Sequence, residues 1–180
     1  MIYEPPKKIR KKQTIYQEDS HSFLIIKHHK YIFDTEDAEV IRSFYWNVRN
    51  GGNCPYLYTA NKYDTSIALH RLLMNLPKGD KRIIDHINQN VFDNRKSNLR
   101  ITDRAGNMMN ITKPQGKNVY RGVHWNKNRN KWYVSVSFRK NETRNTIYGG
   151  CYYDIEDAFK KRKELEIKYF KEFAPQANQT

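Results

Sequence analysis

Residues 83–107 of the 180-residue chain read IIDHINQNVFDNRKSNLRITDRAGN, and this stretch decides how the first half of the chain folds. Two short apolar runs, at 83–87 and 99–102, flank a long polar loop, which predicts two strands joined by that loop. Asp103 follows the second run and is of a residue type that caps helices, so we expect a helix carrying Asn107 and Asn110. The stretch therefore predicts the order strand, loop, strand, helix.

Polar residues recur through this stretch at a defined spacing. Asp85 and His86 lie in the first run, Asn98 stands twelve residues after His86, and Asn107 stands nine residues further on. The pattern also includes an upstream segment, Leu69, His70, Arg71, and the run Asp93, Asn94, Arg95, Asn98, Leu99, Arg100. It resembles the HNH (ββα-metal) endonucleases, specifically the phage and intron-encoded homing branch. The resemblance implies a metal-dependent DNA endonuclease with Asp85, His86, Asn98 and Asn107 as its catalytic residues.

Hydrolysis of a phosphodiester bond gives a chemical reason for these residue types. The reaction needs a nucleophilic water, neutralisation of the charge on the phosphate, and help for the departing oxygen. Mg²⁺ or Mn²⁺ prefers oxygen ligands, so we expect one divalent ion held by Asp85 and Asn107, with Asn110 as an alternative ligand. The resemblance implies that His86 is the general base and that the Asn98 amide pins the loop that positions it. Neighbours on an ideal strand point to opposite faces, so the strand must bend for Asp85 and His86 to act together.

The residues before this stretch are typical of a scaffold. Strands are predicted at 23–26 and 31–33 around a turn at 27–30, and at 45–48 and 55–59 around a turn at 50–53. Asp34 is the predicted cap of a short helix that ends before Trp46, and 67–74 is a predicted helical turn. His70 lies in that turn, where it either supports the active-site helix, which we favour, or approaches the phosphate backbone.

The second half of the chain carries a different pattern. Residues 131–139 alternate between apolar and polar, and residues 155–170 carry an apolar helical stripe, which predicts three strands covered by one helix. The segments YRGV at 120–123, KWYVSV at 131–136 and YGG at 148–150 resemble the ethylene-response-factor (Apetala2-like) DNA-binding domain. The resemblance covers about residues 118–174.

This second resemblance implies a sheet that enters the major groove of DNA. The implied DNA contacts are Arg121, His124, Arg129, Lys131, Ser135, Ser137 and Tyr148, and Arg71, Arg95 and Arg100 of the first half are further candidates. His124, Ser135 and Ser137 stand where the family has arginines, so the target sequence of the plant proteins is not inherited.

The charge of the whole chain favours a polyanionic partner. Lys and Arg number 33 against 19 Asp and Glu, a formal net charge of +14, and double-stranded DNA is the first candidate. No apolar run approaches the roughly 20 residues of a membrane-spanning helix, and no secretory signal is recognisable. Cys54 and Cys151 form no CxxC pair, which disfavours a structural zinc site and favours a reducing cytoplasm.

These observations together predict an α+β protein. It has a basic arm at 1–19, an HNH ββα-metal nuclease domain with a hairpin-rich scaffold at 20–113, a three-stranded antiparallel sheet with one helix at 118–174, and a tail at 175–180. The resemblance implies a phage or mobile-element homing endonuclease of a bacterial cytoplasm, with no small-molecule cofactor. The alternatives are a non-catalytic DNA-binding regulator that retains the HNH scaffold and a non-specific toxin-type nuclease. The oligomeric state stays open, and a monomer on DNA is compatible with the pattern.

Overall fold

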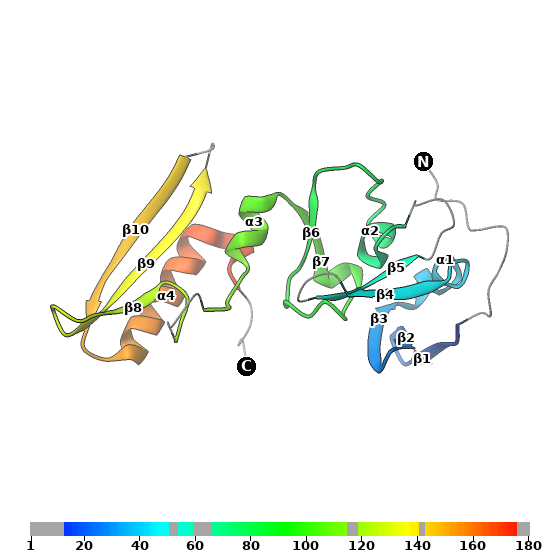
Figure 1. Ribbon diagram of the computed structural model, residues 1–180, viewed down its shortest axis with the longest axis horizontal. Coiled ribbons are helices and arrows are strands. Elements are labelled where there is room, and N and C mark those ends of the chain that lie inside the picture. The colour runs from blue at the N-terminus through cyan, green and yellow to red at the C-terminus, as the bar shows by residue number, and fades with distance from the viewer. Residues whose placement is uncertain (1–12, 51–53, 60–65, 115–118, 141–142, 176–180) are drawn as a thin grey trace. The chain divides into compact units, whose positions relative to one another are not determined.

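The computed structural model describes residues 13–50, 54–59, 66–114, 119–140 and 143–175 of the chain (Figure 1). Within these ranges the fold is α+β, with several small antiparallel sheets and four α-helices. The chain divides into two compact units, Met1–Ile101 and Thr102–Thr180, each with a hydrophobic core of its own.

The first unit begins with a three-stranded antiparallel sheet of β1 (Ile15–Glu18), β2 (His21–Ile26) and β3 (His29–Asp34). Between β2 and β3, Lys27 and His28 have φ values of 49° and 69°. This is the left-handed conformation that two-residue hairpin turns require. The predicted hairpin is confirmed, and both strands start two residues earlier than predicted.

Strand β1 lies within residues 1–19, which were predicted as a basic arm. Ile15 pairs with Leu24, and the ring of Tyr16 stacks on that of Phe23 with 5.1 Å between centroids. Four residues carry little strand signal of their own, and this strand depends on β2 for its backbone partners. Residues 1–12 of the predicted arm lie outside the described residues.

A short helix and a second hairpin complete the scaffold. A 3-10 turn, η1 (Thr35–Asp37), leads into α1 (Ala38–Arg42), which ends before Trp46 as predicted. The side chain of Asp34 does not cap this helix, because it accepts a hydrogen bond from the backbone N–H of Lys96 at 2.8 Å instead. Strands β4 (Trp46–Asn50) and β5 (Pro55–Thr59) form the predicted hairpin, and α2 (Leu69–Leu73) is the predicted helical turn. Their shared core contains Leu24, Tyr31, Phe33, Ile41, Trp46 and Leu57.

Residues 83–107 form the predicted order strand, loop, strand, helix. Strand β6 (Ile83–His86) pairs with β7 (Leu99–Thr102), and the connecting loop contains the short 3-10 turn η2 (Lys96–Asn98). Helix α3 (Arg104–Met109) follows, and its N-cap Asp103 accepts a hydrogen bond from the backbone N–H of Gly106 at 2.8 Å. The capping role predicted for Asp103 is therefore confirmed.

The second unit is a three-stranded antiparallel sheet with a helix packed on one face. The strands β8 (Val123–Asn126), β9 (Lys131–Lys140) and β10 (Thr143–Tyr152) lie in the order β10-β9-β8. Helix α4 (Ile155–Phe170) and the turn η3 (Lys171–Phe173) follow, and the α4 side chains Ala158, Leu165 and Phe170 are buried against Val123, Val134 and Val136. The three strands and one helix predicted for this segment are confirmed.

Two glycines of the YRGV and YGG segments make room for side chains of α4. Gly122 has φ +71°, and a Cβ there would overlap the carbonyl oxygen of Ser135 and lie 2.7 Å from Nη1 of Arg162. A Cβ on Gly149 would lie 2.6 Å from Cδ1 of Leu165. These glycines therefore let the helix pack closely on the sheet.

Helix α3 belongs to the second unit, so the division of the chain falls earlier than the predicted boundary at 113–118. A Cβ on Gly106 would lie 2.9 Å from the ring of Phe173, and Met109 packs on the core of this unit.

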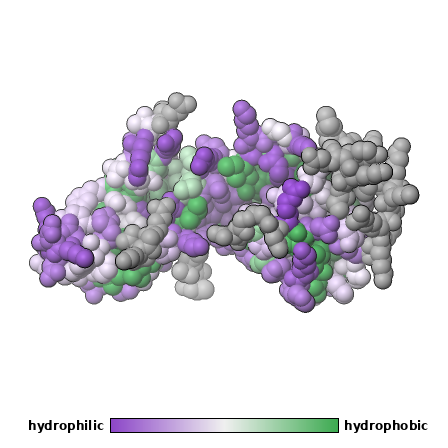
Figure 2. All heavy atoms as spheres, viewed as in Figure 1, coloured by the Kyte–Doolittle hydropathy of each residue, from purple (hydrophilic) through white to green (hydrophobic). Residues whose placement is uncertain are grey.

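Hydrophilic residues are spread over the visible face of both units (Figure 2). No helix in the described part of the chain is long and apolar enough to cross a membrane.

Candidate active site and nucleic-acid interface

Asp85 and His86 are the last two residues of β6, and both are buried, with exposed fractions of 6% and 5%. Oδ2 of Asp85 accepts hydrogen bonds from Nε and Nη2 of Arg100, at 2.8 and 2.6 Å. A buried carboxylate needs such compensation, because burial of an unpaired charge is costly. Arg100, predicted as a DNA contact, therefore serves the carboxylate of the neighbouring strand.

The imidazole of His86 lies among other rings. Its centroid is 6.2 Å from that of Tyr56, at 25° between planes, and 5.5 Å from that of His70 in an edge-on arrangement. Burial lowers the pKa of His86, and the hydrogen bond to Asn94 and the charges of Asp85 and Asp93 oppose this only in part. The ring is therefore neutral at neutral pH, which is the state a general base requires.

His70 of α2 packs against the same group of rings. Its centroid is 5.0 Å from that of Tyr56. Burial lowers its pKa to about 3, and the nearby His86 and Arg71 add to this effect. A ring held uncharged in this way attracts a phosphate weakly, and the contacts of His70 shown here are with Tyr56 and His86.

The side chain of Asn98 ties together the loop between β6 and β7. Its Oδ1 accepts a hydrogen bond from the backbone N–H of Asn88 at 2.9 Å, and its Nδ2 donates to the backbone carbonyl of Asp93 at 2.8 Å. The backbone carbonyl of Asn98 also accepts from the N–H of Ile87 at 2.9 Å. These are the backbone contacts that the resemblance implied for Asn98, and they fix the residues directly after His86.

The same loop is fastened by an ion pair. The Asp93 carboxylate accepts from Nε and Nη2 of Arg95, at 2.8 and 2.7 Å. Burial raises the pKa of Asp93, but the hydrogen bonds and charge of Arg95 outweigh it, so the pKa lies below its ordinary value. Arg95 thus has a structural partner, while its side chain stays 41% exposed at the surface where a DNA contact was predicted.

The loop is also joined to the first sheet. The backbone N–H of Ile32 in β3 donates to the carbonyl of Phe92, and the N–H of Asn94 donates to the carbonyl of Ile32, both at 2.8 Å. The rings of His29 and Phe92 stack with 4.8 Å between centroids. The hairpin-rich scaffold therefore positions the loop that surrounds His86.

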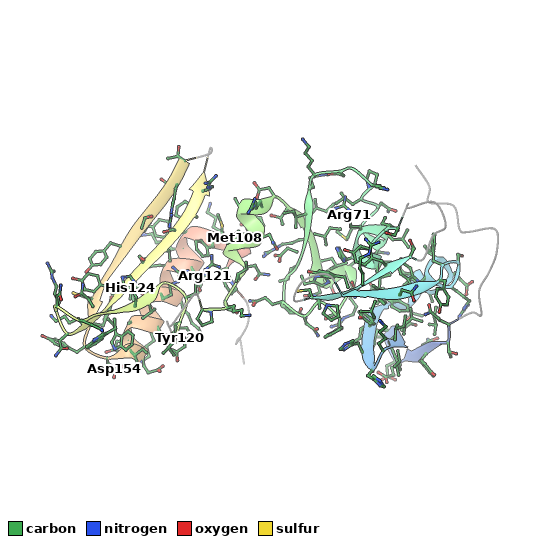
Figure 3. All side chains as sticks on the ribbon, in the orientation of Figure 1. Arg71, Met108, Tyr120, Arg121, His124 and Asp154 are labelled. Atoms are coloured by element: carbon green, nitrogen blue, oxygen red, sulfur yellow. The ribbon has the colours of Figure 1, made fainter. Side chains whose placement is uncertain are left out.

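Arg71 reaches from α2 to the segment that precedes β6 (Figure 3). Its guanidinium donates to the backbone carbonyls of Pro77, Asp80 and Arg82 at 2.9 to 3.0 Å. Three such bonds commit this side chain to the chain's own backbone. The structure thus gives Arg71 an architectural role, and its DNA contact stays a prediction.

The predicted metal ligands lie in different units. Asp85 is on β6, whereas Asn107 is on α3 of the second unit, and Asn110 is the buried C-cap of that helix. In the described part of the chain, no group of three or more His, Cys, Asp or Glu side chains gathers as a metal site.

The face of the second sheet that points away from α4 carries aromatic, hydroxyl and basic side chains. The ring of Tyr133 lies 6.0 Å from that of His124 and 5.7 Å from that of Tyr148, and Oγ of Ser137 is hydrogen-bonded to Thr146 at 2.9 Å. By strand alternation, Lys131, Ser135 and Arg139 share this face with Tyr133 and Ser137, and Arg129 lies in the exposed turn before β9. Residues 119–140 and 143–153 contain no acidic residue. Side chains of these types can contact the phosphate backbone and the base edges of DNA.

Arg121, another predicted DNA contact, also donates to carbonyls of the protein itself. Its Nη1 donates to the carbonyl of Met108 at 2.6 Å and to that of Ile111, at the end of α3 (Figure 3). Burial lowers its pKa, and the charge of Glu166 opposes this. Arg121 therefore holds α3 within the second unit, and its DNA contact stays a prediction.

Comparison of the chain with family models, curated proteins and solved structures gave no significant match. The assignment of a function therefore depends on the residues and contacts of the chain itself.

Sequence reasoning gave no role to two side chains that contact His86. Asn94 is part of the quoted motif and contacts His86. Because asparagine side chains in turns hydrogen-bond to nearby groups, its position among turn-forming residues could have indicated such a contact. Tyr56 lies on β5, 30 residues before His86, and only its place in the predicted hairpin was visible.

Proposed function

We propose that this chain is a metal-dependent DNA endonuclease of the HNH type that hydrolyses phosphodiester bonds. One observation carries the proposal: a buried, neutral His86 follows a buried Asp85 that is paired with Arg100 at the end of a strand, and the loop beside them is fixed by Asn98. Rigid placement of a base and an oxygen ligand is what such a reaction requires.

Each side chain has a distinct task under this proposal. Neutral His86 takes the proton of the attacking water. Asp85 supplies a carboxylate ligand to one Mg²⁺ or Mn²⁺, and Asn107 is the amide ligand that the HNH resemblance implies. The bound ion would neutralise charge on the phosphate and on the departing oxygen. His70 and Tyr56 pack on His86 and keep water away from its ring faces.

The second unit would bind and position double-stranded DNA through the outer face of its sheet. Lys131, Arg129 and Arg139 supply charge for the phosphates, and Tyr133, Ser135 and Ser137 lie where base edges would be reached. A nuclease that carries its own DNA-binding unit suits a site-directed, homing type of activity in a phage or mobile element. The same face is the specific observation behind the second candidate, a DNA-binding regulator without cleavage.

The test uses the full-length chain with Mg²⁺ or Mn²⁺ and a plasmid library of varied sequence. We expect cleavage at a restricted set of sites, and mapped ends would reveal the target and whether one or both strands are cut. His86→Asn should bind the mapped target with unchanged affinity and leave it intact. His28→Asn, the same substitution in an exposed hairpin turn, should cut normally.

Other outcomes separate the alternatives. Undiminished cutting by His86→Asn would refute the base assignment. Selective DNA binding with no cleavage under either ion would leave only the regulator, and cleavage of every plasmid at low protein concentration would indicate a non-specific nuclease.

A further inference from the structure

We propose that Asn94 is a positioning residue that decides which ring nitrogen of His86 carries the hydrogen. In this assignment Nε2 of His86 is protonated and donates to Asn94, and Nδ1 is the nitrogen that accepts a proton from water. The catalytic consequence rests on the proposed function, whereas the state of the ring does not.

The orientation of the Asn94 amide follows from its other partners. Asn94 is 2% exposed, and its Nδ2 donates to the backbone carbonyls of Phe92 at 3.2 Å and Val91 at 3.5 Å. An amide nitrogen only donates and an amide oxygen only accepts. The reversed orientation would place Oδ1 against two carbonyl oxygens, so the arrangement with Nδ2 on these carbonyls is the favourable one.

This orientation leaves Oδ1 of Asn94 facing Nε2 of His86, at a distance of 3.4 Å. Because Oδ1 only accepts, Nε2 must donate. A neutral imidazole has one N–H, so the lone pair is on Nδ1. The other tautomer would set two acceptors against each other inside a buried site. The distance is long for a hydrogen bond, as is common in catalytic sites before substrate binds.

The position of Asn94 is set independently of His86. Its backbone N–H donates to the carbonyl of Ile32 in β3, and on the other side of the loop Asn98 donates to the carbonyl of Asp93. The amide of Asn94 therefore cannot simply follow the imidazole. A fixed acceptor that selects one tautomer is a recurring way to aim a histidine.

The test measures the ring directly. Full-length, metal-free protein labelled with ¹⁵N in histidine is examined by long-range ¹H–¹⁵N correlation, and the His86 signals are assigned from their loss in His86→Asn. We expect Nε2 to have the shift of a protonated nitrogen and Nδ1 that of an unprotonated nitrogen. Nδ1 protonated in the neutral ring would overturn the proposal outright.

One variant and its control separate the acceptor from the bulk of the side chain. Asn94→Leu has a similar volume without an acceptor, and both ¹⁵N shifts should move toward values averaged over the two tautomers. Asn90→Leu, in the exposed part of the same loop, should change neither shift. Unchanged shifts in Asn94→Leu would also overturn the proposal. Should that variant not fold, the wild-type spectrum still decides it.

Cleavage kinetics provide the second measurement. Asn94→Leu should lower kcat about tenfold to a hundredfold at an unchanged KM for DNA, less than the ~10²–10⁴ that loss of a general base removes. The expected tautomer in a chain that never cuts DNA would sustain this inference and refute the proposed nuclease, so the two failures are distinguishable.

Discussion

Asn98→Ala tests how the loop beside His86 is held. The Asn98 amide accepts from the backbone N–H of Asn88 at 2.9 Å and donates to the backbone carbonyl of Asp93 at 2.8 Å. Alanine removes both partners in one step and leaves the backbone hydrogen bonds of residue 98 in place. The loss should therefore weaken the loop without removing a strand.

The two lost hydrogen bonds differ in cost because Asp93 is 3% exposed and Asn88 is exposed. A buried carbonyl without a partner costs ~1–3 kcal/mol, whereas an exposed N–H turns to water and loses about 0.5–1.5 kcal/mol. The sum is roughly 2–4 kcal/mol, which at a urea slope of ~2 kcal/mol per molar lowers the unfolding midpoint by ~1–2 M.

The three tryptophans of the chain allow each unit to be followed separately. The indole N–H of buried Trp46 donates to the carbonyl of Ile41 at 2.9 Å and reports on the first unit by NMR, while Trp125 and Trp132 report on the second. In Asn98→Ala, the Trp46 midpoint in urea should fall by the amount given above. The midpoints of the other two indoles should stay where they are.

The matched control is Asn90→Ala in the same loop. Asn90 is exposed, and its side chain accepts one hydrogen bond, from the backbone N–H of Phe92 at 3.1 Å. Its loss should cost below ~1.5 kcal/mol. A Trp46 midpoint no lower in Asn98→Ala than in Asn90→Ala would refute the reasoning.

Three further predictions use the same reporters or the cleavage assay. Gly122→Ala should unfold the second unit at markedly lower urea, because the residue has φ +71° and no room for a Cβ, whereas Gly79→Ala (φ +90°, with open space around it) should cost less. The folded-state pKa of His70, about 3, lies below its ordinary value, so the unfolded chain takes up the proton first and acidification destabilises the first unit. Stability should fall from about pH 6.5 downward, and His70→Phe should reduce the drop in the Trp46 midpoint between pH 7 and pH 5; an equal drop would contradict the assignment. Removal of divalent ions with EDTA should abolish cleavage, whereas DNA binding should become weaker and still be detected by gel shift.

Elements whose signal is local could be predicted from the sequence. The alternation along β9, the apolar stripe of α4 and the cap at Asp103 each depend on residues within a few positions of one another. Strand β1 could not be predicted in this way, since its four residues form a strand only with β2 as partner. The division of the chain before α3 was missed for the same reason, because α3 packs against a distant residue, Phe173.

The hydrogen-bond partners of the charged side chains also could not be predicted from the sequence. Arg71, Arg100 and Arg121 are basic residues of a basic chain, and a DNA contact was the economical interpretation. The structure directs each of them to the protein's own carbonyls or carboxylate. Arg162 was hidden within the apolar stripe of α4, yet Glu166 one turn later was a readable signal, and the two form a buried ion pair at 2.8 Å.

The pairing of Asp85 with Arg100 constrains how the proposed nuclease would acquire its ion. The two side chains together carry no net charge, so the carboxylate is already compensated when no ion is bound. A divalent ion at Asp85 adds positive charge beside a guanidinium, which is unfavourable in a buried place. A DNA phosphate brings the negative charge that relieves this repulsion. Ion and DNA should therefore assist each other's binding, and by linkage the benefit is equal in both directions. Such coupling confines hydrolysis to the complex in which the phosphate is already in place, which is where a site-directed nuclease needs it.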